Sequence, residues 1–98
     1  MKLLYYIGEV STMPNEFEEK FDALIKKYTE LLLGEWTEEK QEKVEKWVMY
    51  TYISKSMPAL TKHWNETYPQ AKDEMIHLIK EIKLLNDQHR DEMAKKKK

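Results

Sequence analysis

The chain has 98 residues, enough for one domain, and 36% of them are charged, with a net charge of −1. Two glycines and three prolines are too few for the turns of an all-β domain, and 41% hydrophobic residues are too many for a disordered chain. The absence of cysteine excludes thiol catalysis, disulfides and thiolate metal sites. We therefore expect a single all-α domain over residues 1–98.

Residues 1–13 form the most ambiguous part of the sequence. The apolar run from Leu3 to Ile7 is too short for a signal peptide or a membrane span. We therefore expect a cytoplasmic protein with no membrane partner. The run itself is compatible with a short strand, with an extra helical turn, or with an N-terminal arm that docks on the helices.

A first helix is predicted from Pro14–Asn15 to Gly34, a residue suited to end it. Its apolar residues recur at alternating steps of four and three, which places them on one helical face: Phe17, Phe21, Leu24, Tyr28, Leu31 and Leu32. This pattern predicts that Phe21 and Leu24 are core residues.

A second helix is predicted after Thr37, which is a good N-cap. The run from Trp47 to Ile53 is aromatic and β-branched, and taken alone it would suit a buried strand. Because it continues a helical pattern from Val44 and has no hairpin partner, we interpret it as helix. A helix that is apolar nearly all round is expected at the centre of the bundle.

Two more helices follow a predicted break at residues 54–56. The third is short, begins at Pro58 and ends before Pro69. The fourth runs from Pro69 toward the basic tail at residues 95–98, with apolar residues at heptad spacing: Ala71, Met75, Leu78, Ile82, Leu85, His89 and Met93. The sequence thus predicts a compact four-helix bundle with a long C-terminal helix.

Patterns that would indicate catalysis or metal binding are incomplete. Glu74 and His77 have the Glu-x-x-His spacing of di-iron bundles, but neither His63 nor His89 has a glutamate three positions earlier. No nucleophile triad or glycine-rich phosphate loop is present. We expect no catalytic residues, no metal and no cofactor. A pI near 6.3 and a basic tail confined to four lysines also argue against direct nucleic-acid binding.

Two groups of residues are candidates for binding. An aromatic cluster on the second and third helices is either plain core or a pocket for a hydrophobic small molecule: Trp47, Tyr50, Tyr52, Trp64 and Tyr68. The end of the long fourth helix is expected to extend beyond the other helices and to pair with a protein partner or a second copy through Leu78, Ile82, Leu85, His89 and Met93. The alternative is that Leu3 to Ile7 of the N-terminal arm folds back over this seam within the same chain.

Two stretches resemble a known family. Residues 5–11, Tyr5-Tyr6-Ile7-Gly8-Glu9-Val10-Ser11, look like the opening of MerR-type transcriptional regulators. Residues 21–55 resemble the α-helical drug-binding effector domain of the TipAS type, in the stretches Phe21-Asp22-Ala23-Leu24 and Trp36-Thr37-Glu38-Glu39 and in Trp47. After Ser11 the chain lacks the turn and recognition helix of such regulators, so the resemblance implies an effector domain without a DNA-reading helix-turn-helix.

The leading functional hypothesis is a non-catalytic binding or regulatory module that acts through apolar helix surfaces. The alternative, which the resemblance implies, is a small-molecule-binding effector domain with an aromatic pocket around Trp47 and Trp64. An enclosed pocket would favour the second hypothesis, and an open apolar surface would favour the first.

Overall fold

The computed structural model describes residues 14–96. These residues form four helices and no strand: α2 (Pro14–Leu33), α3 (Glu38–Ser56), α4 (Pro58–Thr67) and α5 (Pro69–Lys96). The predicted all-α bundle of four helices with a long C-terminal helix is confirmed. The predictions about the arm at residues 1–13 and the end of the basic tail at residues 97–98 fall outside the described part of the chain. Over residues 14–96, no helix combines the length and the apolar character needed to cross a membrane.

The helix boundaries follow from local chemistry. Gly34 adopts a φ of +93°, a backbone conformation that residues with a side chain rarely adopt. Its N–H donates a hydrogen bond to the Glu30 carbonyl over 2.8 Å, and α2 ends at this turn. The Thr37 hydroxyl accepts a hydrogen bond from the Lys40 N–H over 3.1 Å and caps α3. The predicted break at residues 54–56 is wrong, because α3 continues through Ser56 and only Met57 separates it from α4.

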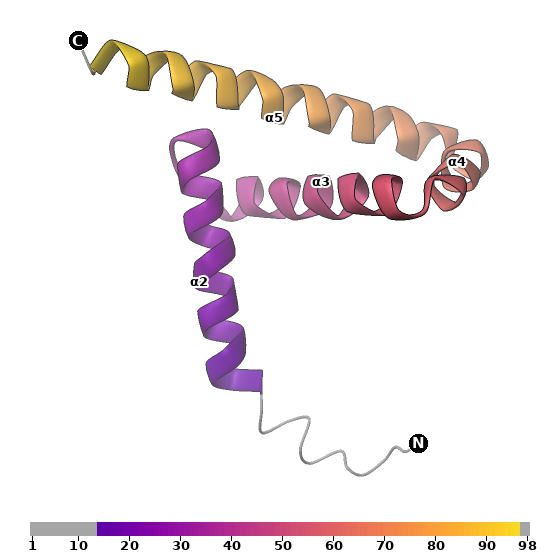
Figure 1. Ribbon diagram of the computed structural model, residues 1–98, viewed down its shortest axis with the longest axis horizontal. Coiled ribbons are helices and arrows are strands. Elements are labelled where there is room, and N and C mark those ends of the chain that lie inside the picture. The colour runs from indigo at the N-terminus through magenta and orange to yellow at the C-terminus, as the bar shows by residue number, and fades with distance from the viewer. Residues whose placement is uncertain (1–13, 97–98) are drawn as a thin grey trace.

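The helices α3 and α5 run antiparallel and side by side, and the short α4 connects them at one end (Figure 1). At the other end α2 crosses them steeply. Its C-terminal part packs on both α3 and α5, whereas its N-terminal half extends away from the other helices (Figure 1). The described chain is therefore a three-helix body with a helix that projects from one end of it.

The core lies where α2, α3 and α5 meet. Its buried hydrophobic residues, among those that the structure describes, are Leu33, Val44 and Ile82. Partly buried side chains pack around them: Leu32, Trp47, Leu78 and Leu85. This is a small core for a chain of this length, and many large apolar side chains remain at the surface.

The apolar face of α2 was assigned wrongly to the core. Phe21 and Leu24 are 51% and 59% exposed, and the helix instead turns Thr29 and Leu33 inward. Thr29 can occupy this position because its hydroxyl donates to the Ile25 carbonyl over 2.9 Å, which satisfies the buried polar group. The sequence pattern identified residues that share a face, but within residues 14–96 no other helix covers that face.

Two further predictions about packing need correction. The helix α3 is buried along one side only, since Val48, Met49 and Tyr52 are exposed. The seam of α5 does not extend beyond the other helices at Leu85 and His89. Leu85 packs against the core, and the His89 ring packs against Gly34. A Cβ atom at position 34 would lie only 2.8 Å from His89 Nδ1. Only the exposed end of the seam at Met93 fits the prediction.

A polar network fixes the direction of α2. Buried Gln41 on α3 accepts from the indole N–H of Trp36 over 2.7 Å and donates to Asp22 on α2 over 2.9 Å. The Lys26 ammonium lies over the Trp36 ring, 4.5 Å from its centre. These contacts tie the middle of α2 to the start of α3, so the projecting helix is held in a defined orientation.

Candidate functional site

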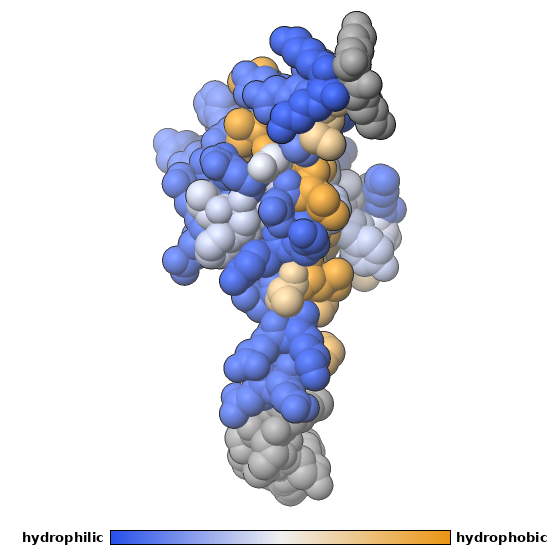
Figure 2. Space-filling view, turned by 90° about the vertical axis from the view of Figure 1, so that its left-hand side faces the viewer, coloured by the Kyte–Doolittle hydropathy of each residue, from blue (hydrophilic) through white to orange (hydrophobic). Residues whose placement is uncertain are grey.

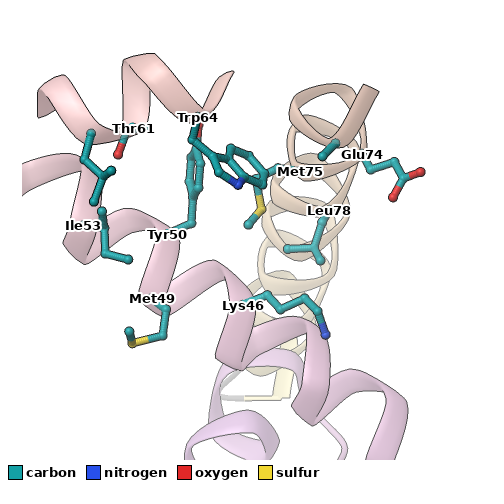
Figure 3. A pocket seen from close by; sticks show the side chains of 11 residues that line it. Lys46, Met49, Tyr50, Ile53, Thr61, Trp64, Glu74, Met75 and Leu78 are labelled. Carbon is teal, nitrogen blue, oxygen red and sulfur yellow. The ribbon is translucent and has the colours of Figure 1, made fainter. Parts of the chain in front are cut away.

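An apolar groove lies between α3, α4 and α5, and we call it the α3–α4–α5 groove. Its volume is about 510 Å³, and Figure 3 shows the side chains that form it. The lining residues are Lys46, Met49, Tyr50, Ile53, Leu60, Thr61, Trp64, Ala71, Glu74, Met75 and Leu78. Each of the three helices contributes to the groove, so it forms only when they pack together.

Tyr50 and Trp64 form the aromatic wall of the groove. Their rings meet edge to face with centres 5.9 Å apart, and the Tyr50 hydroxyl donates to the Asn65 side-chain oxygen over 3.1 Å. The Tyr68 ring also packs against Trp64, with ring centres 6.0 Å apart. Trp64 therefore contacts two aromatic rings, and Tyr50 is held by one ring contact and one hydrogen bond.

Methionine and aliphatic side chains complete the lining. Met75 lines the same groove as Trp64, while the charged ends of Lys46 and Glu74 point away from the aromatic pair (Figure 3). Met49 and Leu60 are 57% and 50% exposed, so the groove is open to solvent along its length. An open apolar groove with adaptable methionine side chains suits a ligand with protruding apolar groups.

The predicted aromatic cluster is divided by the structure. Tyr50 and Trp64 line the groove, whereas Tyr68 packs against Trp64 without lining the groove. Trp47 packs against the core, and Tyr52 is 67% exposed and does not line the groove. Sequence reasoning assigned all five residues to one site because they are close in sequence, although helical rotation points them to different sides of α3 and α4.

The heptad seam of α5 serves two purposes that the sequence did not separate. Its first part, Ala71, Met75 and Leu78, lines the groove. Its later part, Ile82 and Leu85, packs in the core. The same seam spacing covers both parts, so only the positions of the other helices reveal where the groove ends and the core begins.

A charged strip borders the groove between α3 and α5. The Lys43 ammonium is 2.9 Å from a Glu81 carboxylate oxygen and 3.3 Å from Glu39. The hydrogen bond to Glu81, assisted by Glu39, raises the pKa of Lys43, although partial burial opposes this effect. At the start of α3 the hydrogen bond from Lys40 lowers the pKa of exposed Glu35. Of these pairs, only Lys43–Glu81 joins two helices, α3 and α5, and none of the paired residues lines the groove.

The described residues do not assemble a metal site. In residues 14–96 no three histidine, aspartate or glutamate side chains lie close enough together to share a metal ion. Glu81, which shares a helical stripe with His77, instead pairs with Lys43.

Comparison with known proteins identifies relatives of the chain. The profile of the family described as "Protein of unknown function (DUF2573)" matches residues 15–92. The uncharacterized protein YusU of Bacillus subtilis (strain 168) is 52% identical over 79 residues, which cover 81% of this chain and 83% of that protein. No solved structure matches the chain. Neither relationship bears on the resemblance to MerR-type regulators, which stays a prediction. With most of its length inside the matched region, the chain belongs to the DUF2573 family.

Proposed function

We propose that the protein is a non-catalytic interaction module whose α3–α4–α5 groove binds the apolar face of an amphipathic helix in a partner protein. The observation that carries this proposal is the combination of an almost wholly apolar lining with an open mouth. Amphipathic helices are commonly bound in such grooves through side chains spaced three and four residues apart.

The exposed apolar side chains of Met49 and Leu60 would provide a hydrophobic driving force for binding when a ligand covers them. Fully burying a side chain of this kind contributes about 1.5–3 kcal/mol, so covering two that are half exposed contributes about 1 kcal/mol each. The firmly held rings of Tyr50 and Trp64 add area without a large loss of side-chain freedom. Together these terms suit an interaction of modest affinity.

The composition of the lining supports binding over catalysis. Its titratable side chains are Lys46, Glu74 and Tyr50, and Tyr50 uses its hydroxyl to bond Asn65. A nucleophile with its base, or a pair of catalytic carboxylates, requires such groups within hydrogen-bond reach of one another. Among the described residues, no hydrogen bond joins any two of Lys46, Tyr50 and Glu74.

A second candidate is the binding of a hydrophobic small molecule, as in the effector domains that the sequence resembles. The volume of about 510 Å³ favours it, since small-molecule pockets span roughly 300–1,000 Å³. The open mouth of the groove favours the helix, because small ligands are usually enclosed over most of their surface.

Calorimetry with two probes distinguishes these functions. One probe is a designed amphipathic peptide with leucine at positions i, i+3, i+4 and i+7, and the other is the dye anilinonaphthalene sulfonate. We expect the peptide to bind, and Met49→Glu to weaken binding about tenfold or more because it puts a charge against apolar side chains. Val48→Glu is the matched control, since Val48 is the neighbouring exposed residue and does not line the groove.

Each result has a clear meaning. Binding of the dye alone, lost in Met49→Glu, would replace the helix with a small molecule. Equal effects of the two substitutions, or no binding of either probe, would contradict a binding role for the groove.

A further inference from the structure

A second apolar surface, separate from the groove, runs along the projecting helix. We call it the α2 stripe, and its residues are Phe17, Phe21, Leu24, Tyr28 and Leu31, which are 40–66% exposed. Figure 2 looks onto this end of the molecule and shows apolar side chains in a column over α2, from the end of α5 toward the N-terminus. The Phe17 and Phe21 rings stack on each other 5.9 Å apart.

The stripe leaves α2 without the packing that normally stabilises a helix. Helices gain most of their stability in water from burial of an apolar face, and short isolated helices are marginal. The N-terminal half of α2 extends away from α3, α4 and α5 (Figure 1), and its Asp22 is held by Gln41 on the side turned to α3. The apolar face of this half therefore requires a partner that the described residues do not supply.

The size of the stripe fits a second copy of the chain. A large side chain buries about 150–250 Å² when fully covered, so five that are roughly half exposed present on the order of 500 Å². Two such stripes together bury about 1,000 Å², which is the lower limit for a specific protein interface. The family match begins at residue 15, so it includes the whole stripe and leaves out the arm at residues 1–13.

We propose that the protein forms a two-fold homodimer in which the α2 stripes of two protomers pack against each other. Such an interface uses the same patch on both subunits, so it is closed and self-complementary. Because the groove lies between α3, α4 and α5, a dimer built on α2 leaves both grooves free, and the proposal does not rest on the function of the groove.

The charges on α2 indicate that the two helices are antiparallel. The N-terminal half is acidic through Glu16, Glu18, Glu19 and Asp22, against which only Lys20 is positive. The C-terminal half carries Lys26 and Lys27 against the single acidic residue Glu30, which pairs with Lys27, so this half is the more basic of the two. Parallel packing would place the two acidic halves together. Antiparallel packing places each acidic half beside the more basic half of its partner and brings Phe17 opposite Leu31.

Sedimentation of the full chain over a wide dilution series tests the dimer. We expect twice the mass of the chain at high concentration, and a folded monomer for Leu24→Glu, since a charge at the centre of the stripe would be buried without a partner. Met49→Glu is the matched control, because Met49 is 57% exposed and Leu24 is 59% exposed. It should remain a dimer while losing the groove, so the two proposals can fail separately.

Disulfide cross-linking tests the orientation, since the natural chain has no cysteine. A mixture of Phe17→Cys and Leu31→Cys chains should form the mixed cross-linked dimer if the helices are antiparallel. A strong cross-link between two Phe17→Cys chains would overturn that orientation. A wild-type protein that is monomeric at every concentration, or a Leu24→Glu variant that stays dimeric, would overturn the dimer itself.

Discussion

The contact between Gly34 and His89 allows a sharp test of how α2 is joined to α5. Gly34 has a φ of +93°, and a Cβ at this position would meet the His89 ring at 2.8 Å from Nδ1 and 3.2 Å from Cγ. Gly34→Ala therefore has two costs. The left-handed backbone costs about 1–2 kcal/mol for a residue with a side chain. Moving the ring from its preferred rotamer costs about 0.5–1.5 kcal/mol more.

We expect Gly34→Ala to lower the free energy of unfolding by about 2–3 kcal/mol, a large part of the stability of a small domain. The assay is urea denaturation followed by circular dichroism. Two further variants separate the costs. In a His89→Ala background the substitution should cost only the backbone term of about 1–2 kcal/mol. Asparagine tolerates a positive φ, so the cost of Gly34→Asn should come mainly from the clash with the His89 ring.

The reasoning would be refuted by either of two results. A cost below about 0.5 kcal/mol would mean that neither strain nor clash exists at Gly34. An equal cost in the wild-type and His89→Ala backgrounds would mean that the His89 ring does not limit the space at this position, since independent sites give additive effects.

Three other predictions follow from burial and charge. Ile82→Ala should destabilise the fold by about 2–5 kcal/mol in urea denaturation, because Ile82 is 2% exposed, and a cost below about 1 kcal/mol would contradict its place in the core. Thr37→Ala should cost about 1 kcal/mol through loss of the N-cap, whereas Thr37→Asp should restore it; equal losses in both variants would exclude capping. The pKa of Lys43 is raised by Glu81, so the ion pair stabilises the fold below the ordinary lysine value of about 10.4, and this contribution is lost as the pH rises through the raised pKa. The difference in thermal stability between wild type and Lys43→Met should therefore shrink at alkaline pH, and a constant difference would show that the charge of Lys43 plays no part.

Much of the fold could be predicted from local signals. Gly34, Thr37, Pro58 and Pro69 each act within one turn of a helix end, so their chemistry determines the boundaries whatever the rest of the chain does. The break expected at residues 54–56 failed because polar residues alone do not end a helix. Ser56 there bonds back to the Tyr52 carbonyl over 2.9 Å and remains helical.

Burial could not be predicted in the same way. The spacing of Phe17, Phe21 and Leu24 correctly placed them on one face of a helix, but periodicity does not say whether the cover comes from the same chain. The buried positions instead include Thr29 of α2 and Gln41 of α3, whose polar atoms are satisfied by hydrogen bonds to nearby groups. No hydrophobic pattern would identify these two residues.

The sequence predicted only part of the lining of the α3–α4–α5 groove, because the lining depends on how the helices pack. Tyr50 and Trp64 stand out in the sequence as aromatic residues, and both line the groove. Met75 and Leu78 line it as well, but their heptad spacing made them part of a continuous seam. Where that seam becomes a groove depends on how α4 sits against α3 and α5, which is a property of the packed fold.

The central claim is that the α3–α4–α5 groove is a surface for binding a partner helix. The most direct measurement is a nuclear magnetic resonance titration of the isotope-labelled full chain with the designed amphipathic peptide, in which backbone amide shifts report contacts residue by residue. We predict the largest shifts around Met49 to Ile53, Leu60 to Trp64 and Ala71 to Leu78, on the three helices that line the groove. Shifts centred on the α2 stripe with the groove unaffected, or no shifts at saturating peptide, would contradict the claim that the groove binds a partner helix.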